Sequence, residues 1–305
     1  MSTFWGYLLE GVVFTIIWLW WMVNTFVGAI RCQSEGKKFI PRLSYPYPGT
    51  KIPVENLFKL AVSGAGFLAT IFYDGTSLVD AAGNYRKMAT VITMSIYGIF
   101  FVHSVLELLL WFGVPLIRNS DYVTGALGFF WYALATFYRA HDFMHHMSVA
   151  AMVKTFPLYP LFAIGVSLLT EAGNRRGYWT QMIRVVCLGV VATWDWNAAF
   201  ILHRASPFPG EGPSNWDMSD HDNTAFIGAA FGDHICFHLI FLVLAYLATA
   251  TYMRVRLKTP SIQTTCPSEH VYAQSFCTHD LFGTPSPNAL GRLQKKRASI
   301  SLYTY

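Results

Sequence analysis

Long apolar segments alternate with short polar segments along most of this chain. Seven apolar segments are close to the roughly 20 residues that a helix needs to cross the hydrocarbon core of a bilayer. Backbone polar groups in lipid must be bonded internally, and the segments are too continuous for the alternating pattern of an outer-membrane barrel, so helices are predicted. The predicted spans are Phe4–Ile30, Leu57–Tyr73, Met88–Phe112, Val123–Arg139, Val149–Thr170, Trp179–Leu202 and Ala225–Met253.

Composition agrees with a membrane protein. Of the 305 residues, 53% are hydrophobic and only 13% are charged, whereas a typical soluble domain is about 25% charged. We therefore predict an all-α integral membrane protein, with a seven-transmembrane helix bundle over residues 1–255 and a polar, disordered tail over residues 256–305. The net charge of +5 does not indicate a nucleic-acid partner, because the basic residues lie in loops and in the tail.

Basic residues are distributed unevenly between the two sides of the predicted bundle, and this bias predicts orientation. With seven spans, the first, third and fifth loops share a side with the C-terminal tail, and that side holds most lysines and arginines. The other side holds little beyond Arg86, Lys87, Arg139 and Arg204. We predict a lumenal or extracellular N-terminus and a cytosolic C-terminus, in the plasma membrane or in the Golgi and endosomal system.

Ionisable side chains inside the spans are the main candidates for function. Each costs about 2.5–3.5 kcal/mol in hydrocarbon, so such residues usually face the bundle interior and mark a functional site. Two His residues four positions apart share a helix face and can hold one metal ion, with zinc as the candidate. The candidate metal ligands are His234, His238, His141 and His145; the candidate general bases are Asp195 and Asp233; the candidate pocket residues are His103, Glu107, Trp194 and Trp196.

Several of these residues also have a structural interpretation. A single intramembrane His such as His103 is more often a hydrogen-bonded packing residue than a ligand, and Glu107 can pair with it. Glu171 is expected at the cytosolic interface, together with Arg175 and Arg176.

Other features predict architecture rather than chemistry. Gly64 and Gly66 permit close helix contact, and Pro157 and Pro160 should kink or break the fifth span. The acidic run over residues 216–223 lacks the spacing and glycine of an EF-hand, and we interpret it as capping the seventh span.

The residues around the sixth and seventh spans resemble those of the transmembrane protein 45 family. The resemblance rests on Thr193-Trp194-Asp195-Trp196, Phe200, Leu202, Trp216-Asp217, Asp220, Asn223, Phe226 and His234, and on Gly6, Leu9, Gly11, Phe14, Ile16-Ile17 and Trp20 in the first span. It covers about residues 4–255. It implies seven helices with a lumenal or extracellular N-terminus, and a molecular activity that is poorly defined. His238 departs from the family pattern, which has an apolar residue there.

Three functions stay open at this point. The first is binding of a lipid or small amphipathic ligand in a buried His/Asp pocket in the lumenal leaflet. The second is an intramembrane metal-dependent lipid hydrolase, because the His-x-x-x-His motif of the last span resembles seven-helix zinc amidases of the alkaline ceramidase type and receptors of the progestin-adiponectin type. The third is a transporter or proton relay, although the chain has no clear inverted repeat. We prefer ligand binding, and leave open whether the protein is an enzyme.

Overall fold

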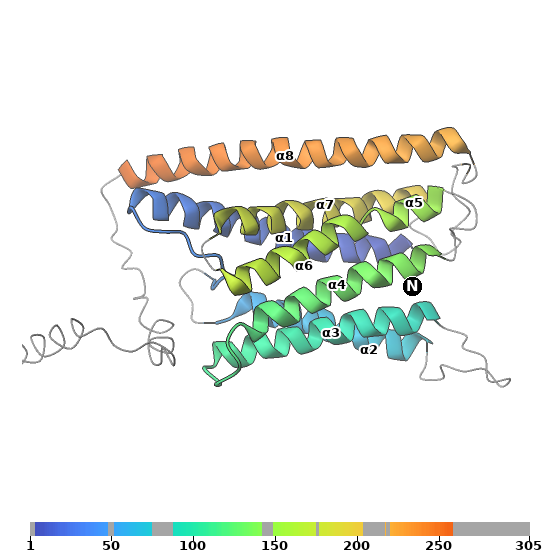
Figure 1. Ribbon diagram of the computed structural model, residues 1–305, viewed down its shortest axis with the longest axis horizontal. Coiled ribbons are helices and arrows are strands. Elements are labelled where there is room, and N and C mark those ends of the chain that lie inside the picture. The colour runs from blue at the N-terminus through green and yellow to red at the C-terminus, as the bar shows by residue number, and fades with distance from the viewer. Residues whose placement is uncertain are drawn as a thin grey trace, which may run out of the picture. The chain divides into compact units, whose positions relative to one another are not determined.

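The described part of the chain consists mainly of long helices (Figure 1). The computed structural model describes residues 4–47, 52–74, 88–141, 149–174, 177–203, 217 and 220–258. The helices are α1 (Phe4–Ser34), α2 (Val54–Asp74), α3 (Met88–Trp111), α4 (Ser120–His141), α5 (Val149–Thr155), α6 (Leu158–Gly173), α7 (Tyr178–Leu202) and α8 (His221–Lys258). The predicted tail lies outside the described residues, apart from its first residues, which end α8.

Six segments of the described chain are long and apolar enough to cross a membrane. They are α1, α2, α3, the combined segment Val149–Gly173, α7 and α8. The description of a multi-pass helical membrane protein is therefore supported. The predicted fourth span is a helix, α4, of 22 residues. At ~1.5 Å per residue α4 is also long enough to cross the hydrocarbon core, but it is not among the six segments that are apolar enough.

The predicted break in the fifth span is confirmed, and it separates α5 from α6. Pro157 stands immediately before α6, and Pro160 lies in its first turn. A proline lacks the backbone N–H that an interior helical position must donate, but it is tolerated in a first turn. The chain therefore breaks between Thr155 and Leu158 and resumes as a new helix.

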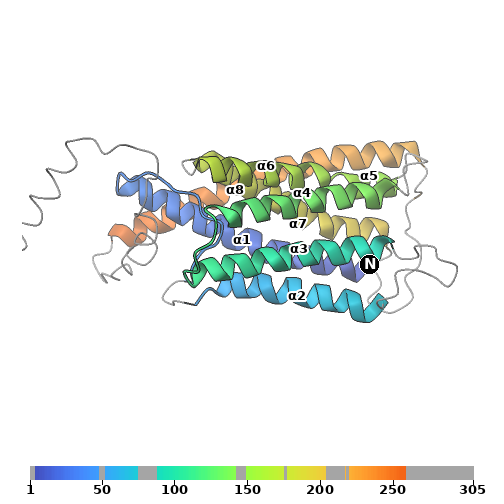
Figure 2. The same cartoon turned by 60° about the horizontal axis from the view of Figure 1, so that its bottom comes forward.

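The packing of the helices follows their order in the sequence only in part. α2 packs against its neighbour α3, whereas α1 packs along α7 and α4 packs against α6. Figures 1 and 2 both show α8 on the opposite side of the bundle from α2 and α3. The predicted role of the α2 glycines is confirmed, because a Cβ on Gly66 would meet the Tyr97 ring at 2.4 Å and one on Gly64 would meet Phe101 at 3.3 Å.

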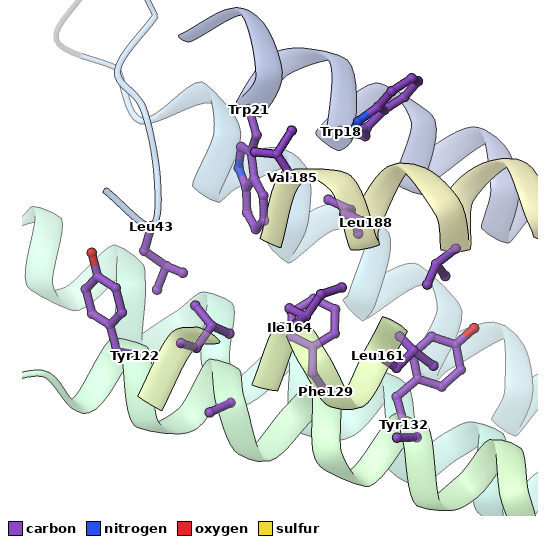
Figure 3. Close-up of a cluster of buried hydrophobic side chains, with 14 of the residues drawn as sticks. Trp18, Trp21, Leu43, Tyr122, Phe129, Tyr132, Leu161, Ile164, Val185 and Leu188 are labelled. Carbon is purple, nitrogen blue, oxygen red and sulfur yellow. The ribbon is translucent and has the colours of Figure 1, made fainter. Parts of the chain in front are cut away.

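The main hydrophobic core lies between α1, α4, α6 and α7 (Figure 3). Its labelled members are Trp18, Trp21, Leu43, Tyr122, Phe129, Tyr132, Leu161, Ile164, Val185 and Leu188. Leu43 belongs to the irregular segment after α1 rather than to a helix, so that segment is packed into the bundle instead of lying on its surface.

Hydrogen bonds hold this segment in place. Tyr45 shares a hydrogen bond of 3.1 Å with Thr25 of α1 and accepts one from Gln181 of α7. The side-chain oxygen of Gln181 accepts the backbone N–H of Arg42 at 3.2 Å. Burial raises the pKa of the Tyr45 hydroxyl, which keeps it protonated and available as a donor.

The start of α8 confirms the predicted cap. Asp220 precedes the helix, and its carboxylate accepts the backbone N–H of Asp222 at 2.9 Å. Asn223 donates to the carbonyl of Asp217 at 3.1 Å. An acidic N-cap satisfies a free N–H group and complements the positive end of the helix dipole.

Candidate functional site

His234 and His238 of α8 converge on one hydroxyl group of α7. Oγ1 of Thr193 lies 2.6 Å from Nε2 of His234 and 2.6 Å from Nε2 of His238. It also donates to the Gly189 carbonyl at 2.8 Å. All three contacts are satisfied when both imidazoles carry their proton on Nε2 and donate to the Thr193 oxygen. The predicted pair thus shares one helix face and points at α7.

The His pair is enclosed on one side by aromatic rings. His238 is fully buried, and its ring meets the Trp18 ring edge-on with centroids 5.1 Å apart. The His234 ring lies 5.8 Å from the Trp194 ring, also edge-on. Trp194 is itself fixed, because its indole N–H donates to the Val153 carbonyl at 2.9 Å.

A groove of about 470 Å³ lies between α7 and α8 next to this pair. Its lining residues are Trp194, Asn197, Ile201, Phe226, Ile227, Ala230, Asp233, His234 and Phe237. Its volume is within the range of about 300–1,000 Å³ typical of small-molecule sites. Most of its wall is apolar or aromatic, and one amide, one carboxylate and one imidazole are the polar groups.

Three of the predicted site residues therefore line the groove: Trp194, Asp233 and His234. The α8 residues Phe226 and Phe237 at its edge are 57% and 60% exposed. In a bilayer these exposed rings would contact lipid chains.

The described residues do not form a metal centre. A catalytic zinc needs three protein ligands, and His234 and His238 supply two imidazoles beside the Thr193 hydroxyl. No group of three or more His, Cys, Asp or Glu side chains comes together among the described residues. The other predicted ligands, the side chain of His141 and all of His145, lie outside the described residues. Zinc binding stays a prediction.

Asp195 lies on a different face of α7 from Thr193. Successive helical residues are about 100° apart, so side chains two positions apart point in nearly opposite directions. Trp196 packs against Gly11 of α1, and Asp195 is only 3% exposed. Neither residue lines the groove. The carboxylate next to the His pair is Asp233 instead.

His103 and Glu107 of α3 belong to a separate charged network with α2. Glu107 accepts Lys59 Nζ at 3.2 Å through both oxygens, and its Oε1 lies 3.6 Å from His103 Nε2. Nδ1 of His103 is hydrogen-bonded to Thr124 Oγ1 at 3.0 Å. Lys59 and its partner Glu55 were not predicted as functional or structural residues, although the spacing of four residues between them is a usable sequence signal.

Glu55 has a complete set of donors. Trp20 and Trp21 donate their indole N–H groups to it at 2.9 and 2.7 Å. The backbone N–H of Tyr45 donates at 2.8 Å, and Lys59 forms an ion pair at 2.7 Å. This arrangement joins α1, the segment after α1 and α2. Because every acceptor position of Glu55 is occupied by a donor from the protein, the residue has a structural rather than a ligand-binding role.

The expected position of Glu171 at the cytosolic interface stays a prediction, but its partner differs from the expected one. Glu171 is fully buried and forms an ion pair with Arg184 of α7 at 3.2 Å. Arg184 also donates to the Arg42 carbonyl at 2.8 Å, and its guanidinium lies 4.7 Å from the centre of the Trp21 ring. The expected neighbours Arg175 and Arg176 lie outside the described residues.

A comparison of the chain with models of known protein families found no match.

Proposed function

We propose that this protein is a seven-helix membrane protein of the transmembrane protein 45 type that binds a lipid or small amphipathic ligand between α7 and α8. The groove beside Thr193, His234 and His238 carries this proposal. It combines apolar walls with Asn197 and Asp233, which suits a ligand that has an apolar body and a polar head. The bilayer is the expected source of such a ligand.

The position of the polar groups along α8 favours this class of ligand. Asp233 lies about 18 Å along the helix axis from His221, the first residue of α8, at ~1.5 Å per residue. The polar head of a bound amphiphile would therefore sit below the membrane surface and contact Asp233 and His234. Its apolar part would lie against Phe226 and Phe237 and extend into the lipid.

Photo-crosslinking tests this proposal. Purified protein in lipid nanodiscs would be exposed to photoactivatable fatty acid, sphingoid base and monoacylglycerol, and the labelled peptides mapped by mass spectrometry. We expect labelling of α7 and α8 residues at the groove. Ala230→Trp fills the groove and should lower labelling at least tenfold, whereas Ala229→Trp changes an exposed position outside the lining and should not.

The polar head can be identified with a second substitution. Asp233→Asn removes the only carboxylate among the groove residues and should weaken labelling by the cationic sphingoid base more than labelling by the neutral monoacylglycerol. Equal labelling of wild type, Ala230→Trp and Ala229→Trp would contradict the groove as the binding site.

The metal-dependent lipid hydrolase is a second candidate, and the convergence of His234 and His238 favours it. In this version the groove holds the substrate, and the two imidazoles hold zinc with at least one ligand from outside the described residues. Elemental analysis of wild type and of His234→Ala/His238→Ala tests it. Near-stoichiometric zinc that is lost in the double variant would support the hydrolase, and folded wild-type protein without zinc would exclude that mechanism.

A further inference from the structure

The α1-facing side of α7 carries acidic chemistry that the ligand groove does not use. A Cβ on Gly11 would lie 2.4 Å from the Trp196 ring and 3.1 Å from the Ala192 carbonyl. The two helices are therefore in close contact at Gly11. The residues that precede Gly11 and Trp196 are the acids Glu10 of α1 and Asp195 of α7, so both carboxyl groups belong to the same level of the α1–α7 contact.

Asp195 lacks a donor for one of its carboxyl oxygens. The side chain is 97% buried, since only 3% of it is exposed, and Oδ2 has no hydrogen-bond partner among the described residues. The charged side chains that act on it electrostatically are Glu10 and Arg139 of α4. Buried acceptors are nearly always paired, so the free oxygen requires a physical explanation.

The groups around this pair come from four helices. Tyr132 of α4 donates to Oε2 of Glu10 at 3.2 Å, and Arg139 donates to Oγ1 of Thr93 on α3 at 2.6 Å. Tyr7 of α1 and Tyr97 of α3 are within electrostatic reach of both acids and of Arg139. The two α8 imidazoles lie on the other face of α7, against Thr193.

The charge balance of this cluster leaves one negative charge in excess. One guanidinium compensates one of the two carboxylates when both are ionised, and an uncompensated charge inside a membrane protein is costly. Two neighbouring carboxyl groups relieve this cost by keeping one proton. A protonated carboxyl group is a hydrogen-bond donor, so Oδ2 of Asp195 can donate a hydrogen bond when it carries the proton.

We propose that Glu10 and Asp195 form an intramembrane proton-binding site that holds a single proton shared between the two carboxyl groups. The reaction is simple proton uptake, in which one carboxylate becomes a carboxylic acid. A proton fits better than a metal cation, because the Arg139 guanidinium would repel a cation and a proton needs no coordination shell of several oxygens. This site is independent of the ligand groove and of zinc.

Infrared difference spectroscopy of the full-length protein in lipid nanodiscs tests the proposal. We expect the C=O stretching band of a protonated carboxylic acid at neutral pH, and its loss on alkaline titration. Asp195→Asn and Glu10→Gln should each remove this band, whereas Asp222→Asn, which changes an exposed acid at the start of α8, should leave it unchanged. Arg139→Gln should shift loss of the band to higher pH, because the positive charge that favours ionisation is gone.

Further outcomes separate this site from its alternatives. Elution as a single folded species is required of each variant, and because Asp195→Asn and Glu10→Gln act on different helices, either one alone can be decisive. A folded wild type without the band at any pH would overturn the proposal, as would a band that survives both substitutions. A band that disappears on addition of sodium at constant pH would show that sodium displaces the proton, and would overturn the claim that this site binds a proton in preference to a metal cation.

Discussion

Lys59 lies between two carboxylates inside the helix bundle. Its ammonium group is 2.7 Å from Glu55 and 3.2 Å from Glu107. Removing one partner of a buried ion pair leaves an uncompensated charge and typically costs about 3–5 kcal/mol. We therefore expect Lys59→Met to lower the free energy of unfolding by about that amount, measured by thermal unfolding in mild detergent.

An exposed ion pair provides the control for this prediction. Lys37 lies 2.8 Å from Glu35, and both side chains are largely in solvent. Solvent screens such pairs, so Lys37→Met should leave the unfolding temperature unchanged. Equal effects of the two substitutions would show that burial does not decide the importance of these pairs.

At the scale of single residues, the face of a helix that a side chain occupies can be predicted from the sequence, but its partner on another helix cannot. The spacing of His234 and His238 correctly predicts a shared face, because the period of a helix is fixed. The same period places Thr193 and Asp195 on opposite faces, so Asp195 cannot join the His pair from α7. Which helix each face meets depends on packing. For that reason Glu10 and Arg184 could not be assigned as partners from the sequence, nor could the pairing of Lys59 with Glu107 on another helix.

Helix contacts at the scale of whole elements depend on small residues at a few positions. Gly189 of α7 faces Trp18 of α1, and a Cβ there would lie 2.6 Å from the indole ring. Overpacking of this kind typically costs about 1–3 kcal/mol. Gly189→Ala should therefore destabilise the protein by that amount, as measured by thermal unfolding in detergent.

Gly232 of α8 is the matched control, since nothing lies within 4 Å of a Cβ built on it. Alanine is up to about 1 kcal/mol better than glycine inside a helix, so Gly232→Ala should be neutral or stabilising. A destabilising Gly232→Ala would mean that another surface, such as a second copy of the chain, covers this face of α8.

The helices themselves are largely predictable from the hydrophobic pattern and from the residues that break or cap a helix. The apolar runs predicted the helices, Pro157 and Pro160 predicted the break between α5 and α6, and the acidic run over residues 216–223 predicted a cap before α8. The ends of the helices were less predictable. α8 begins at His221 and ends at Lys258, beyond the predicted span Ala225–Met253, because a helix tolerates polar residues outside the hydrocarbon. The order in which helices pack has no local signal in the sequence.

At the scale of the whole molecule, α4 decides the topology. Six qualifying segments alone would return the chain to its starting side, whereas a seventh crossing places the two ends on opposite sides. Figure 1 shows the N-terminal end of α1 and the first turns of α8 at one end of the bundle, and the last turns of α8 at the other. This arrangement and the distribution of basic residues both favour a crossing by α4.

An inserted glycosylation acceptor measures directly on which side of the membrane each end of the chain lies. The chain has no Asn-x-Ser/Thr sequence, so a tag carrying one reports only its own location, because such sites are glycosylated on the lumenal side of the secretory membranes. We expect the tag to be glycosylated when placed before Met1 and unmodified when placed after Tyr305. Modification at both ends, or at neither, would mean an even number of crossings and would leave α4 outside the membrane.

The same result would remove the bilayer from around one side of the α1–α7 contact, because α4 supplies both Tyr132 and Arg139 to it. The topology experiment therefore also tests whether Glu10 and Asp195 lie in a membrane interior, where their shared charge is costly enough to hold a proton.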